Sequence, residues 1–160
     1  MSNRVLDLCT ICSFGVPCRP SPNPKIIEVT WHPSALDYHG CVLGAFCSNL
    51  DVSSAVHAEV LAVIKAIKLA WLHAWHKVWI ETDSLLVTQF FRYPHLVPWR
   101  LRVDWLNCLH RLQHMLFKIS HIFREGNHGA AALADHGALD SGCTCWDTAP
   151  SFILSFYHRD

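Results

Sequence analysis

The sequence lacks a long uninterrupted apolar run. A membrane-spanning helix needs about 18 or more consecutive apolar residues, and the most hydrophobic stretch, Val60 to Trp75, is interrupted by Lys65, Lys68 and His73. Residues Met1 to Cys18 also lack the continuous apolar core and small-residue cleavage site of a secretory signal. We therefore expect no transmembrane helix, and a protein that stays inside the cell, in the nucleus or the cytoplasm, and is not secreted.

The chain has no excess of charge of either sign, since 13 Lys and Arg balance 13 Asp and Glu. A neutral sum argues against a strongly electrostatic nucleic-acid binder. The distribution is less even, because the segment from Arg92 to Arg124 contains a single acid, Asp104, among six basic residues: Arg92, Arg100, Arg102, Arg111, Lys118 and Arg124. This segment is either a set of solvated helix faces or a phosphate-binding surface.

A disulfide framework is not expected, although the chain has eight cysteines. The chain is long, has a core-forming composition and lacks an export signal, so most of these thiols should be reduced. Cys9 and Cys12 have the spacing of half a zinc knuckle, but Cys143 and Cys145, the next pair, have the wrong spacing to complete it. We therefore favour ordinary thiols over a structural zinc site.

The 160 residues are 51% hydrophobic, which is enough to build the core of one domain. Prolines concentrate in residues Met1 to Pro24 and predict a Pro-rich N-terminal tail. We expect one domain from Lys25 to Asp140 and a C-terminal tail from residue 141 to 160.

Hydrophobic periodicity predicts strands and helices in alternation along the domain. The safest helix is His57 to Ala74, and Ser84 is well placed to cap another from Leu85 to Phe91. The expected strands are Lys25–Trp31, ended by Pro33, then Cys41–Cys47, Val78–Thr82 and Phe117–Phe123, and the further helices are Trp99–Met115 and His128–Leu139. This pattern predicts an α/β domain with helices packed against a mixed sheet.

Three segments carry acids where a strand meets a helix or a helix begins. They are Ala58-Glu59, then Trp79-Ile80-Glu81-Thr82-Asp83-Ser84, and finally the strand that leads into Gly126-Asn127. In this order they resemble the type-1 ribonuclease H-like domains of plant non-LTR retrotransposons, over about Lys25 to Asp160. The resemblance implies a ribonuclease H-like mixed sheet flanked by helices.

By this resemblance Glu59 matches the second catalytic and metal-binding acid of the family, and Asp83 matches the third. The family uses four acids and Mg²⁺ or Mn²⁺ to cleave the RNA strand of an RNA–DNA hybrid by two-metal hydrolysis. Taken singly, each residue has a simpler interpretation, because carboxylates are favoured in the first turn of any helix and an Asp before a Ser is a common helix entry. The order and spacing of the motifs favour a metal site.

Two of the four family acids have no match. In the family, the opening strand and a hairpin lie between a Trp-x-Pro-Pro segment and a later turn. Here Trp31-His32-Pro33-Ser34 is followed almost at once by Asp37-Tyr38-His39-Gly40. The strand or strands that open the sheet and carry the first acid are therefore expected to be missing. Ala131 stands where the fourth acid belongs. Asp135 lies about 6 Å further along the predicted helix and is a weak substitute, as is Glu28 for the first acid.

The remaining candidates concern the nucleic acid. The resemblance points to Ser84, Arg124 and Asn127 for nucleic-acid contacts, including phosphates or 2′-hydroxyls. His121 is better explained as a core histidine than as an acid–base catalyst, and His128, in the turn, is the better placed of the two for product release.

The resemblance therefore implies a nucleic-acid-binding ribonuclease H-like domain whose partner is an RNA–DNA hybrid. With two acids absent, we expect this chain to be weakly active or inactive, and its binding of Mg²⁺ or Mn²⁺ to be poor. The alternatives are a catalytically dead binding module that uses the Arg92 to Arg124 segment, or a non-functional retroelement remnant.

Overall fold

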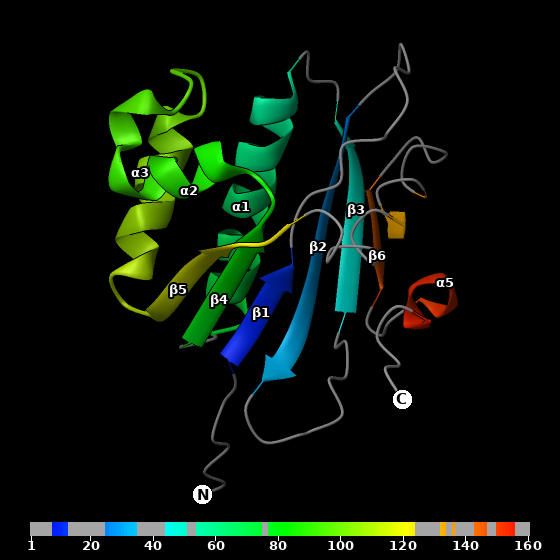
Figure 1. Ribbon diagram of the computed structural model, residues 1–160. Helices are drawn as coiled ribbons and strands as arrows, with labels where there is room; N and C mark the ends of the chain where they lie inside the picture. Colours follow the sequence, from blue (N-terminus) through cyan, green and yellow to red (C-terminus); the bar gives the residue numbers. More distant parts are fainter. Residues whose placement is uncertain are drawn as a thin grey trace, which may run out of the picture.

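The computed structural model (Figure 1) describes residues 8–12, 25–34, 44–50, 54–74, 77–123, 132–133, 136, 143–146 and 150–155. Six strands form one sheet in the order β5-β4-β1-β2-β3-β6. Strands β1, β4 and β5 run parallel, whereas β1–β2, β2–β3 and β3–β6 pair antiparallel. The strands are β1 Leu8–Cys12, β2 Lys25–Ser34, β3 Gly44–Leu50, β4 Lys77–Thr82, β5 Leu116–His121 and β6 Cys143–Trp146.

The helices lie beside the two halves of this sheet. In Figure 1, α1, α2 and α3 gather near β4 and β5, and α5 lies near β6. Their bounds are α1 Ala55–Leu72, α2 Leu85–Arg92, the 3-10 turn η1 Pro94–Leu96, α3 Arg102–Leu112 and α5 Ser151–Leu154. The predicted α/β class, a mixed sheet flanked by helices, is confirmed.

The core lies between α1, α2, α3 and the sheet. Helix α1 is rich in alanine and β-branched residues, and its buried face presents Val60, Ala62, Val63, Ile64, Ala66, Ile67 and Ala70 to the layer below. Val78 and Ile80 of β4 are fully buried in the same cluster, because alternate residues of a strand point to the same face of the sheet. Within the described residues, no helix has the length and apolar character that a membrane span needs.

The predicted helices fall close to the observed ones. The helix expected at His57 to Ala74 is α1, that expected at Leu85 to Phe91 is α2, and that expected at Trp99 to Met115 is the shorter α3. Of the predicted helix His128–Leu139 the structure describes Ala132, Leu133 and His136, all helical.

Strand β2 continues through Pro33, where the sequence analysis ended it, so that boundary was wrong. Pairing of β2 with β3 stops at Trp31 and Gly44, while pairing with β1 continues to Ser34. Only one edge of β2 is paired at Pro33, and a proline can sit there because its missing N–H is not needed on the unpaired edge.

The N-terminal segment also differs from the expectation. Leu8–Cys12, inside the predicted tail, forms β1 between β2 and β4. The expected gap left by a missing opening strand is therefore filled, because the inner edges of β2 and β4 offer backbone groups that need partners. At the other end, β6 pairs with β3 and Ile153 of α5 packs against Leu133, so residues after 140 also contribute to the packed structure.

Candidate nucleic-acid site

Asp83 lies at the junction of β4 and α2. Hydrogen bonds from the end of β5 hold the backbone at this junction. The Nε2 atom of His121 lies 3.1 Å from the carbonyl oxygen of Asp83, and since a carbonyl only accepts, this nitrogen must donate. The Ile122 N–H donates to the carbonyl of Thr82 at 3.0 Å. The end of β5 thus fixes the position at which β4 delivers its carboxylate.

The turn after Asp83 is fixed by two side-chain hydroxyls. The Ser84 N–H donates to Thr82 Oγ1 at 3.1 Å, and the Val87 N–H donates to Ser84 Oγ at 3.3 Å. Ser84 is therefore the N-cap of α2, as the sequence predicted. Thr82 is fully buried, and Oδ1 of Asp83 is also buried from solvent. At least one oxygen of the carboxylate is therefore enclosed by the protein.

Glu59 and Asp83 lie at the same end of the domain. The connection from Leu72 at the end of α1 to Lys77 at the start of β4 is short. The distance along the α1 axis from Leu72 back to Glu59 is about 20 Å, at about 1.5 Å per residue. The distance along β4 from Lys77 to Asp83 is also about 20 Å, at about 3.3 Å per residue. The two predicted acids are therefore at a similar height above the connection, and Glu59 is half-buried like Asp83.

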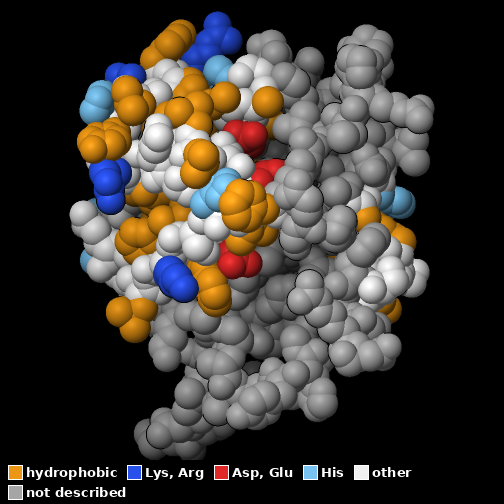
Figure 2. All heavy atoms as spheres, viewed as in Figure 1, with side chains coloured by type: hydrophobic (Ala, Val, Ile, Leu, Met, Phe, Trp, Pro, Cys, Tyr) orange, Lys and Arg blue, Asp and Glu red, His pale blue; other side chains and the backbone are white. Residues whose placement is uncertain are grey.

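Acidic side chains are indeed grouped on one face of the molecule. Figure 2 shows them near the centre of this face, with His and hydrophobic side chains around them. The first acid of the family's set is not found there: strand β1, which takes the central place of the sheet, reads Leu-Cys-Thr-Ile-Cys and contains no carboxylate. Glu28 lies on β2, paired with Cys47 of β3, and β2 is separated from β4 by β1. The strand of Glu28 is therefore not the neighbour of β4, which weakens Glu28 further as a substitute for the first acid.

The donor set does not fit a pair of hard divalent cations. Mg²⁺ prefers about six oxygen ligands in octahedral geometry, and two ions need several shared carboxylates. Across the described ranges there is no group of three or more His, Cys, Asp or Glu side chains that could hold a metal ion. Glu59 and Asp83 alone do not assemble a two-metal centre, so no hydrolytic step is assigned to them.

Glu81 belongs to a polar arrangement that the sequence analysis missed. The Nε1 atom of Trp79 donates to Ser120 Oγ at 2.6 Å, and this hydroxyl lies 3.5 Å from Glu81 Oε1, to which it donates. The ammonium of Lys118 lies 3.9 Å from the centroid of the Trp79 ring. The signal was the alternation of β4 itself, since Trp79 and Glu81 alternate with the buried Val78 and Ile80 and so belong to the opposite face.

The basic segment is divided among separate tasks. The guanidinium of Arg102 donates to the carbonyls of His95 and Val97, at 2.9 and 3.3 Å, and so stabilises the loop after η1. Arg100 lies over the ring of Trp99 at 5.4 Å. These two arginines support the interpretation of solvated and structural positions for part of the segment.

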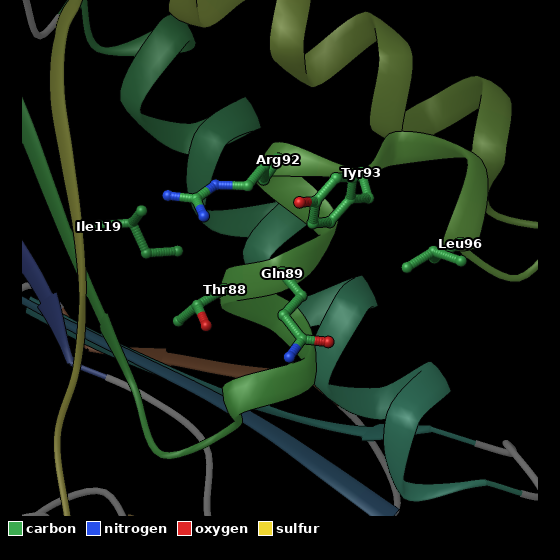
Figure 3. A pocket seen from close by; sticks show the side chains of 6 residues that line it. All are labelled: Thr88, Gln89, Arg92, Tyr93, Leu96 and Ile119. Carbon is green, nitrogen blue, oxygen red and sulfur yellow. The ribbon is translucent and has the colours of Figure 1, made fainter.

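Arg92 is placed differently. It lines a hollow of about 530 Å³ together with Thr88, Gln89, Tyr93, Leu96 and Ile119. Figure 3 shows its guanidinium reaching from the end of α2 toward Ile119 of β5, with Thr88 and Gln89 one turn below. The hollow lies beside α2, the helix that begins just after Asp83. Its lining offers a cation, an amide and a hydroxyl to a ligand.

Several predicted site residues lie outside the described residues. These are Arg124, Asn127, His128, Ala131 and Asp135. Their assignments remain predictions from the sequence. Of the predicted nucleic-acid contacts, Ser84 is described, and its hydroxyl is engaged in capping α2.

The sheet order and the parallel–antiparallel pattern, together with an acid after β4 and another on α1, define a ribonuclease H-like domain. Solved ribonucleases H share this fold. Ribonuclease H1 of Halobacterium salinarum superimposes with a TM-score of 0.62 at 22% identity, covering 82% of this chain and 98% of that one. The N-terminal ribonuclease H domain of a Mycobacterium tuberculosis protein gives 0.65 at 16% identity, covering 85% and 96%. LC11 ribonuclease H1, solved in complex with an RNA/DNA hybrid, gives 0.63 at 18% identity, covering 83% and 98%.

The sequence itself matches the family described as reverse transcriptase-like over residues 35–137, so the chain belongs to that family. An Arabidopsis thaliana protein named "Putative ribonuclease H protein" is 28% identical over 130 residues, which are 78% of this chain. The chain spans 20% of the length of that relative. The predicted ribonuclease H-like resemblance is thereby confirmed.

Proposed function

We propose that this chain is a nucleic-acid-binding ribonuclease H-like domain that takes an RNA–DNA hybrid and hydrolyses it weakly or not at all. The observation that carries the proposal is the combination of an acidic end, with Asp83 and Glu59 at a similar height, and a central strand β1 that contains no carboxylate. The RNA/DNA hybrid bound by the similar LC11 ribonuclease H1 supports the choice of ligand. An origin in a plant non-LTR retrotransposon and an intracellular location belong to the same proposal.

The weak hydrolysis follows from the ligand count. Each cation of a two-metal centre must be held while it activates water or stabilises the leaving oxygen, and too few protein oxygens leave both cations loosely bound. The carboxylates that are present would favour Mg²⁺ or Mn²⁺ over softer ions, but as two separate groups they give low affinity. Binding of nucleic acid needs no such centre, because positive side chains and hydrogen-bond donors suffice.

Binding without cleavage is the more specific form of this proposal, and the hollow at Arg92 favours it. A guanidinium can hold a phosphate through two parallel hydrogen bonds, and Gln89 and Thr88 beside it add neutral donors. The ligand is then held along α2, the helix that follows Asp83, without the chemistry that four acids provide.

Cleavage is tested with an end-labelled RNA–DNA hybrid in Mg²⁺ and in Mn²⁺, with Asp83→Asn alongside. We expect little or no cleavage by either protein, with a cooperative melting curve as the folding check. Strong metal-dependent cleavage that Asp83→Asn abolishes contradicts the proposal and means that other acids complete the site.

Binding is tested by fluorescence anisotropy with hybrid, duplex DNA and duplex RNA at several salt concentrations. We expect hybrid affinity to fall as salt rises, to survive Asp83→Asn, and to drop about tenfold in Arg92→Ala, as expected for loss of a charge-assisted phosphate contact. Arg100→Ala, which removes the same charge over Trp99, is the matched control and should change little. No binding by a folded protein refutes the proposal, and a protein without a cooperative transition supports the retroelement remnant instead.

A further inference from the structure

A second hollow lies at the opposite end of α1 from the acids. It has a volume of about 400 Å³ and is lined by Trp71 of α1 and by Asn107, His110, Arg111 and His114 of α3 and the turn after it. The rings of His110 and His114 are 5.4 Å apart between centroids, and that of Trp71 lies 6.0 Å from His114. An aromatic wall and two imidazoles therefore face the same space.

The hollow carries a positive charge that its surroundings leave uncompensated. The described residues that line it include no Asp or Glu, and Nη1 of Arg111 is buried with no hydrogen-bond acceptor among the described residues. Asp104, the acid of α3, is engaged by Lys68, with 3.1 Å between Nζ and Oδ1. Arg111 lines the hollow, so an anion brought there lies beside the charge of its guanidinium.

Cys108 does not neutralise Arg111. Burial raises the pKa of the Cys108 thiol, and the opposing effects of Arg111 and Lys68 are smaller. The thiol therefore stays protonated at neutral pH, and its Sγ lies 3.8 Å from the carbonyl of Ile64, to which it donates. The charge on Arg111 remains available to a ligand.

The hollow is distinct from the acidic end. Trp71 is twelve residues beyond Glu59 on the same helix, which places it about 18 Å away along the axis at about 1.5 Å per residue. A ligand held by the acidic end does not occupy it unless the ligand is long.

We propose that this hollow is a binding site for a nucleoside monophosphate unit, with the phosphate near Arg111 and the two imidazoles and the base against Trp71. The volume falls in the range of about 300–1,000 Å³ that is usual for small-molecule sites. Arginine and imidazole N–H groups are donors that suit phosphate, and an exposed Trp ring gives a base a stacking surface. The unit is either a free nucleotide or the terminal nucleotide of a strand, and the site does not depend on the proposed hybrid binding.

The test is calorimetric titration of the full chain with AMP, adenosine and inorganic phosphate. We expect AMP to bind about tenfold more tightly than either fragment, because stacking and phosphate contacts act together. A 5′-phosphorylated oligonucleotide is the second probe: equal affinity to AMP identifies the free nucleotide as ligand, and tighter binding identifies a strand end.

Variants locate the site. Trp71→Leu, Arg111→Gln and the exposed pair His110→Gln with His114→Gln should each weaken AMP binding about fivefold or more, whereas Trp99→Leu and Arg100→Gln, the matched controls, should not. Each variant is first checked by its melting curve, and because the two histidines are exposed, their substitution tests the site even where Arg111→Gln fails to fold. Absence of saturable AMP binding by the folded protein, an equal loss in the control variants, or binding of Ni²⁺ by the histidine pair without AMP binding overturns the proposal.

Discussion

The two ends of helix α1 differ in the charge gathered around them. At the N-terminal end, Glu59 shares its level with Asp83 at the end of β4. At the C-terminal end, Trp71 shares a hollow with Arg111, His110 and His114. One buried face, from Val60 to Ala70, supports both ends, so the difference comes from what the neighbouring elements deliver and not from the helix itself.

The acidic and the basic end of α1 can support different functions. Two carboxylates near a central strand without acids form an incomplete set for metal ions, and an incomplete set loses affinity steeply because each cation needs several ligands. A basic hollow needs fewer partners, since one guanidinium can hold a phosphate. We therefore expect binding functions to persist at both ends while hydrolysis does not.

The largest effect is expected from the core that joins the two ends. Trp105 is fully buried, its Nε1 donates to the carbonyl of Phe90 at 3.3 Å, and its ring lies 4.7 Å from that of Phe91. Trp105→Ala should lower the free energy of unfolding by about 3–5 kcal/mol, measured by urea denaturation. As the Trp105→Ala variant is heated, its affinities for the hybrid and for AMP should be lost at the same temperature. If one affinity is kept where the other has been lost, the two ends do not share one cooperative core. Trp105→Phe is the milder control.

The second effect concerns cysteine chemistry beside the basic end. Because alkylation requires the thiolate and burial raises the pKa of Cys108, the exposed Cys145 should be modified at least about tenfold faster than Cys108 at pH 8. Raising the pH should increase both rates, with Cys108 lagging, and unfolding in denaturant should bring the rates together. Peptide mass spectrometry after timed iodoacetamide treatment measures both sites, and equal rates in the native protein would show that Cys108 is accessible.

The third effect is at the acidic end. Ser84→Ala removes the hydroxyl that accepts from the Val87 N–H, and loss of such a cap should destabilise the protein by about 1 kcal/mol. Hybrid affinity should fall modestly as well, because α2 also carries Thr88, Gln89 and Arg92, which line the hollow proposed to hold a phosphate. Ser84→Thr retains a capping hydroxyl and should restore most of the stability; a Thr variant as unstable as Ala would mean that the cap is not the cause.

The smallest effect is at the other end of α1, and it has the opposite sign. Ala74 follows the helix with a φ of 54°, a left-handed conformation that favours glycine. Ala74→Gly should raise the free energy of unfolding by about 0.5–1 kcal/mol. Ala70→Gly, at a buried helical position, is the control and should destabilise, so a thermal melt in which both variants shift the same way rejects this explanation.

Much of the helical half was predictable because its signals are local. The 3.6-residue periodicity of α1, the hydroxyl of Ser84 before α2 and the apolar alternation of β4 all act within a few residues. Glu59 and Asp83 were singled out in a different way, through the resemblance to the family, because the order and spacing of the motifs match it. Trp79 and Glu81 were missed because their partners, Lys118 and Ser120, are about 40 residues away on β5.

The sequence by itself determined the alternation of strands and helices, the two acids and the absence of a carboxylate at Ala131 and in Leu8–Cys12, because these depend on residue type and short spacing. Only the tertiary structure decided that Leu8–Cys12 is the central strand, since a five-residue strand is stable there only by pairing with both β2 and β4. It also decided that β2 passes through Pro33, and that Trp71 meets Arg111 and His114. Those contacts join residues that are far apart in the chain, and packing, not local preference, brings them together.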